Sequence, residues 1–490
     1  MGISMVYPEN YNKPTRLLLL VSAIWFGTFG IALAEKVTLS ADHWGVAEGK
    51  ACIDCHKKSS PGLFRQWEES AHAEAGVNCL DCHQAVAADD DAVEHEGAVI
   101  ATIVSPRDCG RCHTAESKEM HNSVHSQAVA LIGNRIPALA ESVSEKALLQ
   151  AGCTQCHGSV VEVRGDGTLS PESWPNTGIG RINPDGSRGS CSACHGRHQF
   201  SKAQARAPGA CTRCHSGADS PDDEVYAGSK HGLLFTANRH RMNLDSDRWV
   251  TGRDYSAAPT CVTCHMGAAP GLNASHDVGM REAWSLNGPV SEQQYLVIFE
   301  DGERRELPVA QPVPRRKSDL AKLDGSTATV KAAATPKQRR QAMSRVCVEC
   351  HSKGFTSGFM RQFDNAMDLY NESFGKPALS IMRALYEKGL LTATAFDEPL
   401  EFTYWKLWHD EGTRFRHGAA MAGPSQTGWQ GLHRIAQLYY GSFLPQLREV
   451  AGEETAKSLI DKYTSDREAR NDTGYPRAPI PLVGYGAGKP

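Results

Sequence analysis

The chain contains 490 residues, of which 52 are Lys or Arg and 56 are Asp or Glu, so its formal net charge is only −4. Because no basic run is longer than a few positions, the sequence lacks the positive surface of a nucleic-acid-binding protein, and no nucleic-acid partner is expected. A chain of this length ordinarily folds as two or three domains.

The N-terminal residues have the three parts of a secretory signal peptide. Lys13 and Arg16 precede an apolar stretch at 17–31, and the small-residue sequence A-L-A follows at 32–34. An uncleaved membrane anchor is the alternative, but the apolar stretch is short for a membrane span. We therefore predict a signal peptide at 1–34 and a soluble, exported mature protein, periplasmic or otherwise outside the cytoplasm.

One motif, Cys-x-x-Cys-His, dominates the rest of the chain. It occurs eight times and uses all sixteen cysteines, so no thiol remains for a disulfide. The cysteines are Cys52, Cys55, Cys79, Cys82, Cys109, Cys112, Cys153, Cys156, Cys191, Cys194, Cys211, Cys214, Cys261, Cys264, Cys347 and Cys350. The motif histidines are His56, His83, His113, His157, His195, His215, His265 and His351.

Three kinds of site use closely spaced cysteines and histidines. A zinc site uses two cysteine pairs or later histidines and needs no histidine directly after each pair. A redox dithiol occurs once, near a βαβ pattern. Cys-x-x-Cys-His is the attachment signature of c-type haem, in which the cysteines form thioethers and the histidine binds the iron. We predict eight covalently attached c-type haems, each with a motif histidine as the proximal iron ligand.

The second ligand of each iron must come from the remaining twelve histidines. An electron-transfer haem usually has two strong axial ligands, whereas a catalytic haem keeps one position open. Twelve histidines are enough to fill the second axial position of all eight irons, so their number alone does not show whether one position stays open. Sequence context favours His72, His121, His125, His198, His231, His276, His409 and His417 as ligands. We expect His95, between acidic residues, and His240, among arginines, to be solvated.

Seven motifs lie within residues 35–288, at irregular spacings that exclude a repeat of fixed period. This haem-rich region is predicted to form short helices and Gly/Pro-containing loops. The stretch at 174–189 has no helical period and is predicted to be an ordered loop between motifs four and five.

The C-terminal half has a different pattern. At 289–336, an apolar run, an Asp-Gly turn and a second extended stretch predict a β-hairpin followed by an exposed linker arm. At 337–470, apolar residues recur at i, i+3, i+4 and i+7, which predicts a helical domain that carries the eighth motif. Residues 471–490 are predicted to form an extended tail. The fold class is therefore mainly α, a multihaem cytochrome c with a haem-packed N-terminal region and a C-terminal helical bundle.

Several longer sequence segments resemble those of a known protein family. The eight motifs, together with "WPNTGIGRINPDGSRGSCSACHGRH", "DYSAAPTCVTCHM" and "WHDEGTRFRHGAAMAGP", resemble the hydroxylamine oxidoreductase family of octahaem cytochromes c from about Cys52 to about Glu449. The resemblance implies a mostly helical fold, a homotrimer, seven bis-histidine haems and one five-coordinate catalytic haem. That haem is the fourth, with His157 as its proximal ligand.

Two departures from the family pattern bear on its chemistry. Oxidising members crosslink the catalytic haem to a tyrosine, but this chain has Ser425 and Gln426 where the family has Asp and Tyr, so its haem should be unlinked. Family members also have an Asp-His pair after motif six for proton transfer. In this chain Asp219 is the acidic residue of the pair, and Ser220 stands in place of the histidine. Serine does not act as an acid or base near neutral pH, whereas histidine does. Asp219 is therefore the candidate proton donor.

Three functions follow from this reading. Without the tyrosine, we expect a reductase of small nitrogen oxides, namely nitrite, nitric oxide or hydroxylamine, possibly to ammonium, fed by a cytochrome or a quinol-linked donor. Oxidation of hydroxylamine or hydrazine is the second function, and a non-catalytic electron-transfer subunit is the third. Arg181 and Arg188 are candidates to hold an anionic substrate, although binding of haem propionates is an equal alternative.

Overall fold

The computed structural model describes residues 46–132, 152–218, 220–300, 302–319 and 328–464, all within one compact unit, Trp44–Pro490. The predicted signal peptide at 1–34, the predicted tail at 471–490 and the candidate proton donor Asp219 lie outside these residues. Among the residues that the structure describes, no helix is long and apolar enough to cross a membrane.

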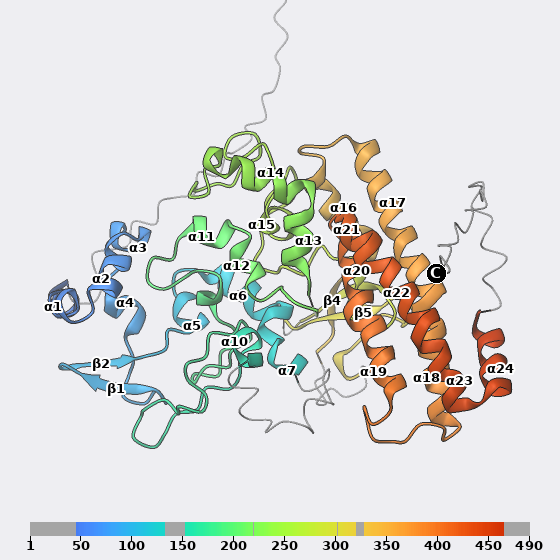
Figure 1. The fold of residues 1–490 in the computed structure, drawn as a ribbon. Coiled ribbons are helices and arrows are strands. Elements are labelled where there is room, and N and C mark those ends of the chain that lie inside the picture. Colours follow the sequence, from blue (N-terminus) through green and yellow to red (C-terminus); the bar gives the residue numbers. More distant parts are fainter. Residues whose placement is uncertain (1–45, 133–151, 219, 301, 320–327, 465–490) are drawn as a thin grey trace, which may run out of the picture. The chain divides into compact units, whose positions relative to one another are not determined.

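The haem-rich region consists of short helices joined by long loops, as predicted (Figure 1). Its α-helices are α1 (Val46–Ser59), α2 (Pro61–Glu68), α3 (Ala71–Glu74), α4 (Cys79–His83), α5 (Pro106–Cys109), α6 (Thr114–Asn122), α7 (Val129–Ile132), α10 (Thr154–His157), α11 (Lys202–Arg206), α12 (Gly209–Thr212), α13 (Asp222–Gly228), α14 (Lys230–Asn238) and α15 (Cys261–His265). The predicted loop at 174–189 contains no helix or strand.

Local capping explains why several motifs adopt a helical turn. Asn78 accepts hydrogen bonds from the backbone N–H groups of Leu80 and Asp81 at the start of motif two. Ser105 and Thr260 begin the helices of motifs three and seven in the same reciprocal arrangement. These capping boxes satisfy N–H groups that have no partner within the helix, so the cysteine pair is presented on a stable turn.

A small β-hairpin follows motif two and was not predicted from the sequence. Strands β1 (Ala92–His95) and β2 (Ala98–Ala101) pair antiparallel, with His95 opposite Ala98. Glu96 and Gly97 both have positive φ, at 50° and 82°, as tight hairpin turns require. The turn therefore fixes the last residue of β1, His95, at a defined place beside motif one.

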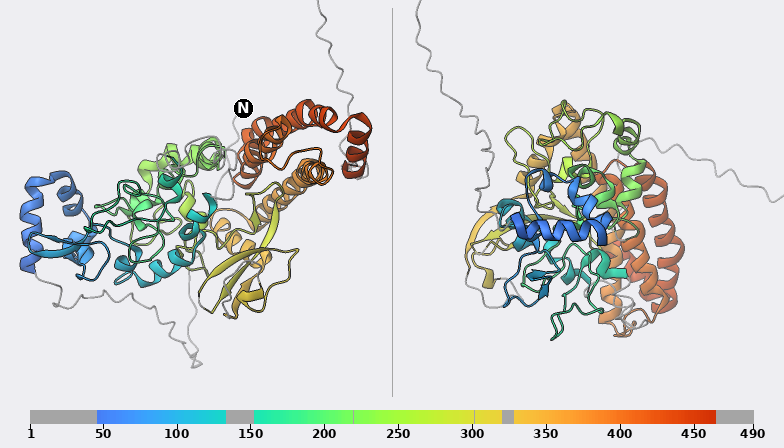
Figure 2. Two further views of the ribbon diagram at one scale, coloured as in Figure 1. Left: turned by 90° about the horizontal axis from the view of Figure 1, so that it is seen from below. Right: turned by 90° about the vertical axis from the view of Figure 1, so that its left-hand side faces the viewer.

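Residues 284–334 form a four-stranded antiparallel sheet next to α16 (yellow in Figure 2). Its strands are β3 (Trp284–Ser285), β4 (Glu292–Phe299), β5 (Arg304–Pro308) and β6 (Val330–Ala334). The pairing of β4 with β5 confirms the predicted hairpin. At 330–334 the predicted linker is instead a strand, because β6 pairs with the second edge of β4, although most of its residues are exposed as predicted. This pairing satisfies backbone groups that the edge would otherwise leave open.

The C-terminal residues form the predicted bundle of longer helices (Figure 1). These are α16 (Pro336–Cys347), α17 (Lys353–Tyr370), α18 (Lys376–Glu387), α19 (Pro399–Trp405), α20 (Gly412–Ala420), α21 (Pro424–Thr427), α22 (Arg434–Leu438), α23 (Leu444–Ala451) and α24 (Glu453–Thr464). Four π-helical segments join them, at Asn371–Gly375, Lys406–Glu411, Gly428–His433 and Tyr439–Phe443. The amphipathic periodicity predicted the helices but not the wider turns within them.

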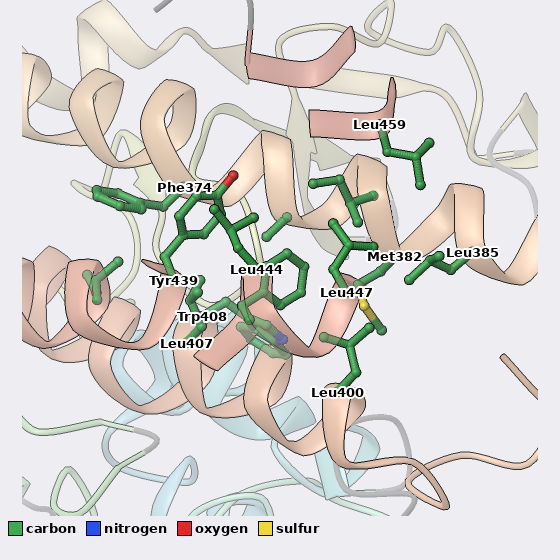
Figure 3. Close-up of a cluster of buried hydrophobic side chains, with 14 of the residues drawn as sticks. Phe374, Met382, Leu385, Leu400, Leu407, Trp408, Tyr439, Leu444, Leu447 and Leu459 are labelled. Atoms are coloured by element: carbon green, nitrogen blue, oxygen red, sulfur yellow. The ribbon is translucent and has the colours of Figure 1, made fainter. Parts of the chain in front are cut away.

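The core of this bundle is apolar and fully buried. Leu385 of α18 packs with Leu400, Leu407 and Leu447, and none of these four side chains is accessible to solvent (Figure 3). Each buried leucine contributes about 1.5 to 3 kcal/mol of hydrophobic stabilisation. The bundle therefore holds a protein core of its own, unlike the loop-rich region that carries seven motifs.

A buried arginine ties the bundle to the loop between β3 and β4. Arg416 has no exposed surface, and its guanidinium lies 4.6 Å from the ring centroid of Tyr370. It donates hydrogen bonds to the carbonyls of Gly412 at 2.9 Å, Trp408 at 2.9 Å and Gly288 at 2.6 Å. The charge is thus solvated by backbone carbonyls from two parts of the chain.

Replacing this arginine is expected to destabilise the fold strongly. Arg416→Met keeps much of the volume but leaves several buried carbonyls unpaired, at about 1–3 kcal/mol each. We expect a loss of about 3 kcal/mol or more, measured as a lower urea midpoint of the haem-loaded protein. Arg434→Met is the matched control, because this side chain is half exposed and lies 3.7 Å from Glu411. Equal midpoints for the two variants would contradict the assignment.

Candidate haem centre

Several motif histidines have an acceptor at Nδ1, whereas Nδ1 of His56 is buried without a hydrogen-bond partner among the described residues. Nδ1 of His83 lies 2.8 Å from the carbonyl of Ala101, and Nδ1 of His157 lies 3.1 Å from the carbonyl of Ala128. Nδ1 of His265 lies 3.1 Å from a carboxylate oxygen of Glu282. An acceptor at Nδ1 fixes the proton there and leaves Nε2 for a metal, which is the usual second-shell arrangement of metal-binding histidines.

Six motif histidines face a second histidine across a constant gap. The ring centroids are 6.1–6.5 Å apart in the pairs His56–His95, His83–His198, His113–His72, His195–His276, His215–His125 and His351–His231. An iron bound by two imidazole nitrogens at about 2 Å each separates the centroids by about 6 Å. The spacing therefore fits a haem iron between each pair, with the motif cysteines beside it for the thioether bonds.

The motifs also touch one another through their cysteines. Cys109 hydrogen bonds Cys191, which brings motif three to motif five. Cys211 hydrogen bonds Cys261, which brings motif six to motif seven. The thiols of four further pairs are near enough to act on one another electrostatically: Cys52 and Cys79, Cys82 and Cys112, Cys194 and Cys211, and Cys264 and Cys347. The motifs thus follow one another as neighbours in the order one, two, three, five, six, seven, eight.

Motif four lies beside motif six. Cys156 lies beside Cys214 of motif six, and burial together with that neighbouring thiol raises the pKa of Cys156 to about 11. Motif four is thus a branch from motif six. A haem at the end of such a branch can receive electrons from the haems of the series.

Comparison with known proteins agrees with this geometry. Residues 184–299 and 328–399 match the family model described as "Seven times multi-haem cytochrome CxxCH". Residues 139–216 match "Cytochrome c7 and related cytochrome c".

Two curated relatives are similar to the chain. A probable nitrite reductase-hydroxylamine oxidoreductase fusion protein of Kuenenia stuttgartiensis is 25% identical over 355 residues, covering 64% of this chain and 35% of the relative. The multiheme cytochrome MtrA of Shewanella baltica is 25% identical over 241 residues, covering 48% of this chain and 60% of the relative. The chain therefore spans less than two thirds of either relative.

Two solved structures share the fold. A hypothetical multiheme protein has a TM-score of 0.68 at 23% identity, covering 83% of this chain and 96% of that one. A reducing HAO-like protein complex of Kuenenia stuttgartiensis, HAO being hydroxylamine oxidoreductase, has a TM-score of 0.57 at 19% identity, covering 84% and 87%. The chain thus has the fold of multihaem cytochromes c and is similar to hydroxylamine oxidoreductase-like proteins.

Most of the predicted distal ligands of this cytochrome lie opposite a motif histidine. His72, His125, His198, His231 and His276 each do so. Burial lowers the pKa of His125 and of His195 to about 4. Both rings are therefore neutral near pH 7, the form in which imidazole binds a metal.

His95 is the ligand candidate that the sequence interpretation missed. His95 is exposed, as we expected from its acidic neighbours, but its ring also lies 6.2 Å from that of His56. The hairpin turn at Glu96 and Gly97 directs the strand end toward motif one. The signal was present in the alternating stretch before the Glu-Gly turn, which the sequence interpretation did not treat as a hairpin.

The other three predicted ligands of the cytochrome are placed differently. His121 is exposed on α6, and within the described residues its ring is not paired with a motif histidine. His409 stacks on Trp405 at 4.1 Å, and its Nδ1 lies 2.9 Å from a carboxylate oxygen of Asp410. His417 donates from Nδ1 to Asp222 at 2.6 Å, while its Nε2 is buried without a hydrogen-bond partner. Of the three, His417 alone has a buried nitrogen of this kind.

Ser220, which replaces the family histidine, contacts a proximal ligand. Its hydroxyl lies 2.9 Å from Nδ1 of His215 and donates to Asp222 at 2.8 Å. The resemblance implied a place in the distal pocket of the fourth haem, whereas the structure puts Ser220 beside the motif-six histidine. Asp219 lies outside the described residues, so its role as proton donor stays a prediction.

Arg181 is a structural residue of the loop at 174–189. It is 2% exposed, and it donates to Asn183 at 2.7 Å and to the carbonyls of Asn176 and Val104 at 3.4 and 3.3 Å. Burial, and then the neighbouring Arg197, lower its pKa to about 10. Each of its nitrogens is thus engaged by the protein, which argues against the predicted anion-binding role, while Arg188 is exposed.

Gln426 occupies the position of the family tyrosine and faces its own chain. It is 5% exposed on α21, and its side-chain oxygen is buried without a hydrogen-bond partner. Gly418 of α20 makes room for it, since a Cβ at Gly418 would lie 2.9 Å from the Cβ of Gln426. No phenol is present at this position to couple to a haem.

Proposed function

We propose that this cytochrome carries eight covalent c-type haems and reduces small nitrogen oxides, namely nitrite, nitric oxide or hydroxylamine, at motif four. A five-coordinate haem supplies an open iron position and the electrons for such a reduction. Cys153 and Cys156 would hold this haem covalently. His157 would bind its iron through Nε2, with Nδ1 fixed on the carbonyl of Ala128.

The observation that carries the proposal is a contrast between motif histidines. Six of them face a second histidine ring at 6.1–6.5 Å. Within the described residues, His157 and His265 are the motif histidines not paired with such a ring. His417 is proposed below as the second ligand at motif seven, which leaves His157, with its Nδ1 on the carbonyl of Ala128, as the motif histidine without one. An iron at His157 is therefore the best candidate to keep a position for substrate.

The reductive direction is supported by two features. Gln426 cannot form the phenol crosslink found in oxidising members of the family. The relatives include a protein named as a nitrite reductase-hydroxylamine oxidoreductase fusion and a complex named as reducing. We extend this direction to the present chain and include a cytochrome or quinol-linked donor, a homotrimer and export from the cytoplasm in the proposal.

Spectra of the haem-loaded protein test the proposal. We expect the ferric protein to show one high-spin haem among low-spin ones in electron paramagnetic resonance, and nitrite or cyanide to convert it to low spin. Reduced protein should then consume nitrite and hydroxylamine. A protein with low-spin haems only, which binds neither ligand, would contradict the proposal.

That contradicting outcome defines the second candidate function, a non-catalytic electron conductor. It is favoured by the unbroken series of motif contacts and by the similarity to a protein named multiheme cytochrome MtrA. An all-low-spin protein that still passes electrons between soluble donors and acceptors would establish it.

A further inference from the structure

One carboxylate connects two histidines from distant parts of the chain. Asp222, the first residue of α13, lies 3.0 Å from Nδ1 of His215 through one oxygen and 2.6 Å from Nδ1 of His417 through the other. His215 belongs to motif six, whereas His417 lies on α20. Asp222 and His417 are 195 positions apart in sequence, so the contact depends on the tertiary fold.

The hydrogen-bond geometry at this junction is that of a carboxylate between two donors. Each oxygen of Asp222 has one imidazole Nδ1 within hydrogen-bond distance. An ionised carboxylate only accepts hydrogen bonds, so both imidazoles carry their proton on Nδ1. Both therefore direct a bare Nε2 away from Asp222.

The free nitrogen of His417 needs a partner. Its Nε2 is buried and makes no hydrogen bond, and the His417 side chain is 13% exposed. A buried nitrogen without a partner is costly in a folded protein. A metal ion at Nε2 removes this cost, and the same arrangement is usual for iron-binding histidines.

Helix α13 also packs against motif seven. Tyr226 Oη donates to the carbonyl of Pro259 at 2.8 Å, two positions before Cys261, the first cysteine of motif seven. The motif-seven histidine, His265, has its Nδ1 on Glu282 and lacks a second histidine ring among the described residues. His417 is bound by Asp222 of the same helix, so it is the candidate ligand for the motif that still requires one.

We propose that Asp222 is a positioning residue shared by two haem irons: it orients His215 at motif six and His417 as the second ligand at motif seven. A carboxylate acceptor makes an imidazole more electron-rich and stabilises the ferric state of its iron. One side chain therefore sets two neighbouring reduction potentials together. This rests on the haem assignment of the proposed function but not on its substrate.

Asp222→Asn tests the shared role. An amide offers one acceptor oxygen and cannot accept from both Nδ1–H groups, so the acceptor strength falls at both sites. In a substrate-free redox titration of the haem-loaded protein, we expect two of the midpoint potentials to shift upward and two low-spin resonance signals to change together. Asp223→Asn, the neighbouring residue, whose carboxylate accepts from the backbone N–H of Glu224, should move neither. A change in a single haem, or in none, would overturn the shared role.

His417→Ala tests the ligand assignment separately. We expect one additional high-spin haem in the ferric protein, with an unchanged haem content. Restoration of the low-spin signal by added imidazole would exclude a folding defect. No new high-spin signal would overturn the assignment of His417. Because neither measurement includes a substrate, a failure of nitrite reduction alone would leave these results intact and would count only against the proposed reaction.

Discussion

Removing both cysteines of motif four is expected to abolish nitrite reduction while leaving the conducting series in place. Cys153→Ala with Cys156→Ala deletes both thioether bonds, so this haem is lost or bound only weakly. We expect the haem content per chain to fall by about one in eight. Reduction of nitrite by a small-molecule donor should fall at least about 10³-fold, which corresponds to about 4 kcal/mol of activation free energy.

The matched control removes a haem from the end of the series. Cys347→Ala with Cys350→Ala at motif eight should lower the haem content by the same amount. Because motif six is also reached from motif five, through Cys194 and Cys211, electrons from a small donor can still reach motif four, and we expect less than about a tenfold loss of activity. Equal losses in the two variants would show that motif four has no special role.

Much of the architecture could be predicted because it depends on local sequence. The motifs identify the haem attachment sites without any structure, since the cysteine and histidine spacing itself carries the chemistry. The apolar periodicity of 358–375 and 377–391 predicted helices, and the structure has α17 at Lys353–Tyr370 and α18 at Lys376–Glu387. The pairing of β4 and β5 followed from an Asp-Gly turn between two extended stretches.

The pairing of histidines could not be predicted, because it depends on contacts through space. His95 appeared to be solvated, since its sequence neighbours are charged, yet a two-residue turn places it opposite His56. Ser220 was interpreted by its place in a family motif, whereas its hydroxyl contacts the ring of His215. In both cases the deciding partner is absent from the local sequence, and no residue pattern of a single chain identifies it.

The two histidines of one sequence segment, His121 and His125, give the sharpest test of the pairing. Both were predicted as ligands, but the structure pairs only His125, whose ring lies 6.2 Å from that of His215. His125→Ala should therefore convert one low-spin haem to high spin, which is visible in the resonance spectrum and reversed by imidazole. His121→Ala should leave the spectrum unchanged, because His121 lies on the exposed side of α6.

The effect on turnover should be larger than the loss of one ligand suggests. Motif six is a neighbour of motif five at Cys194, of motif seven at Cys261 and of motif four at Cys156. We therefore expect electrons bound for motif four to pass this junction. Loss of a strong axial ligand raises the reorganisation energy of each electron transfer through this haem and shifts its reduction potential. We expect steady-state nitrite reduction to fall by roughly ten- to a hundredfold, the range typical of an altered metal environment. Were His121→Ala to produce the high-spin haem and the slower turnover instead, the assignment of motif six as the branch point would be wrong.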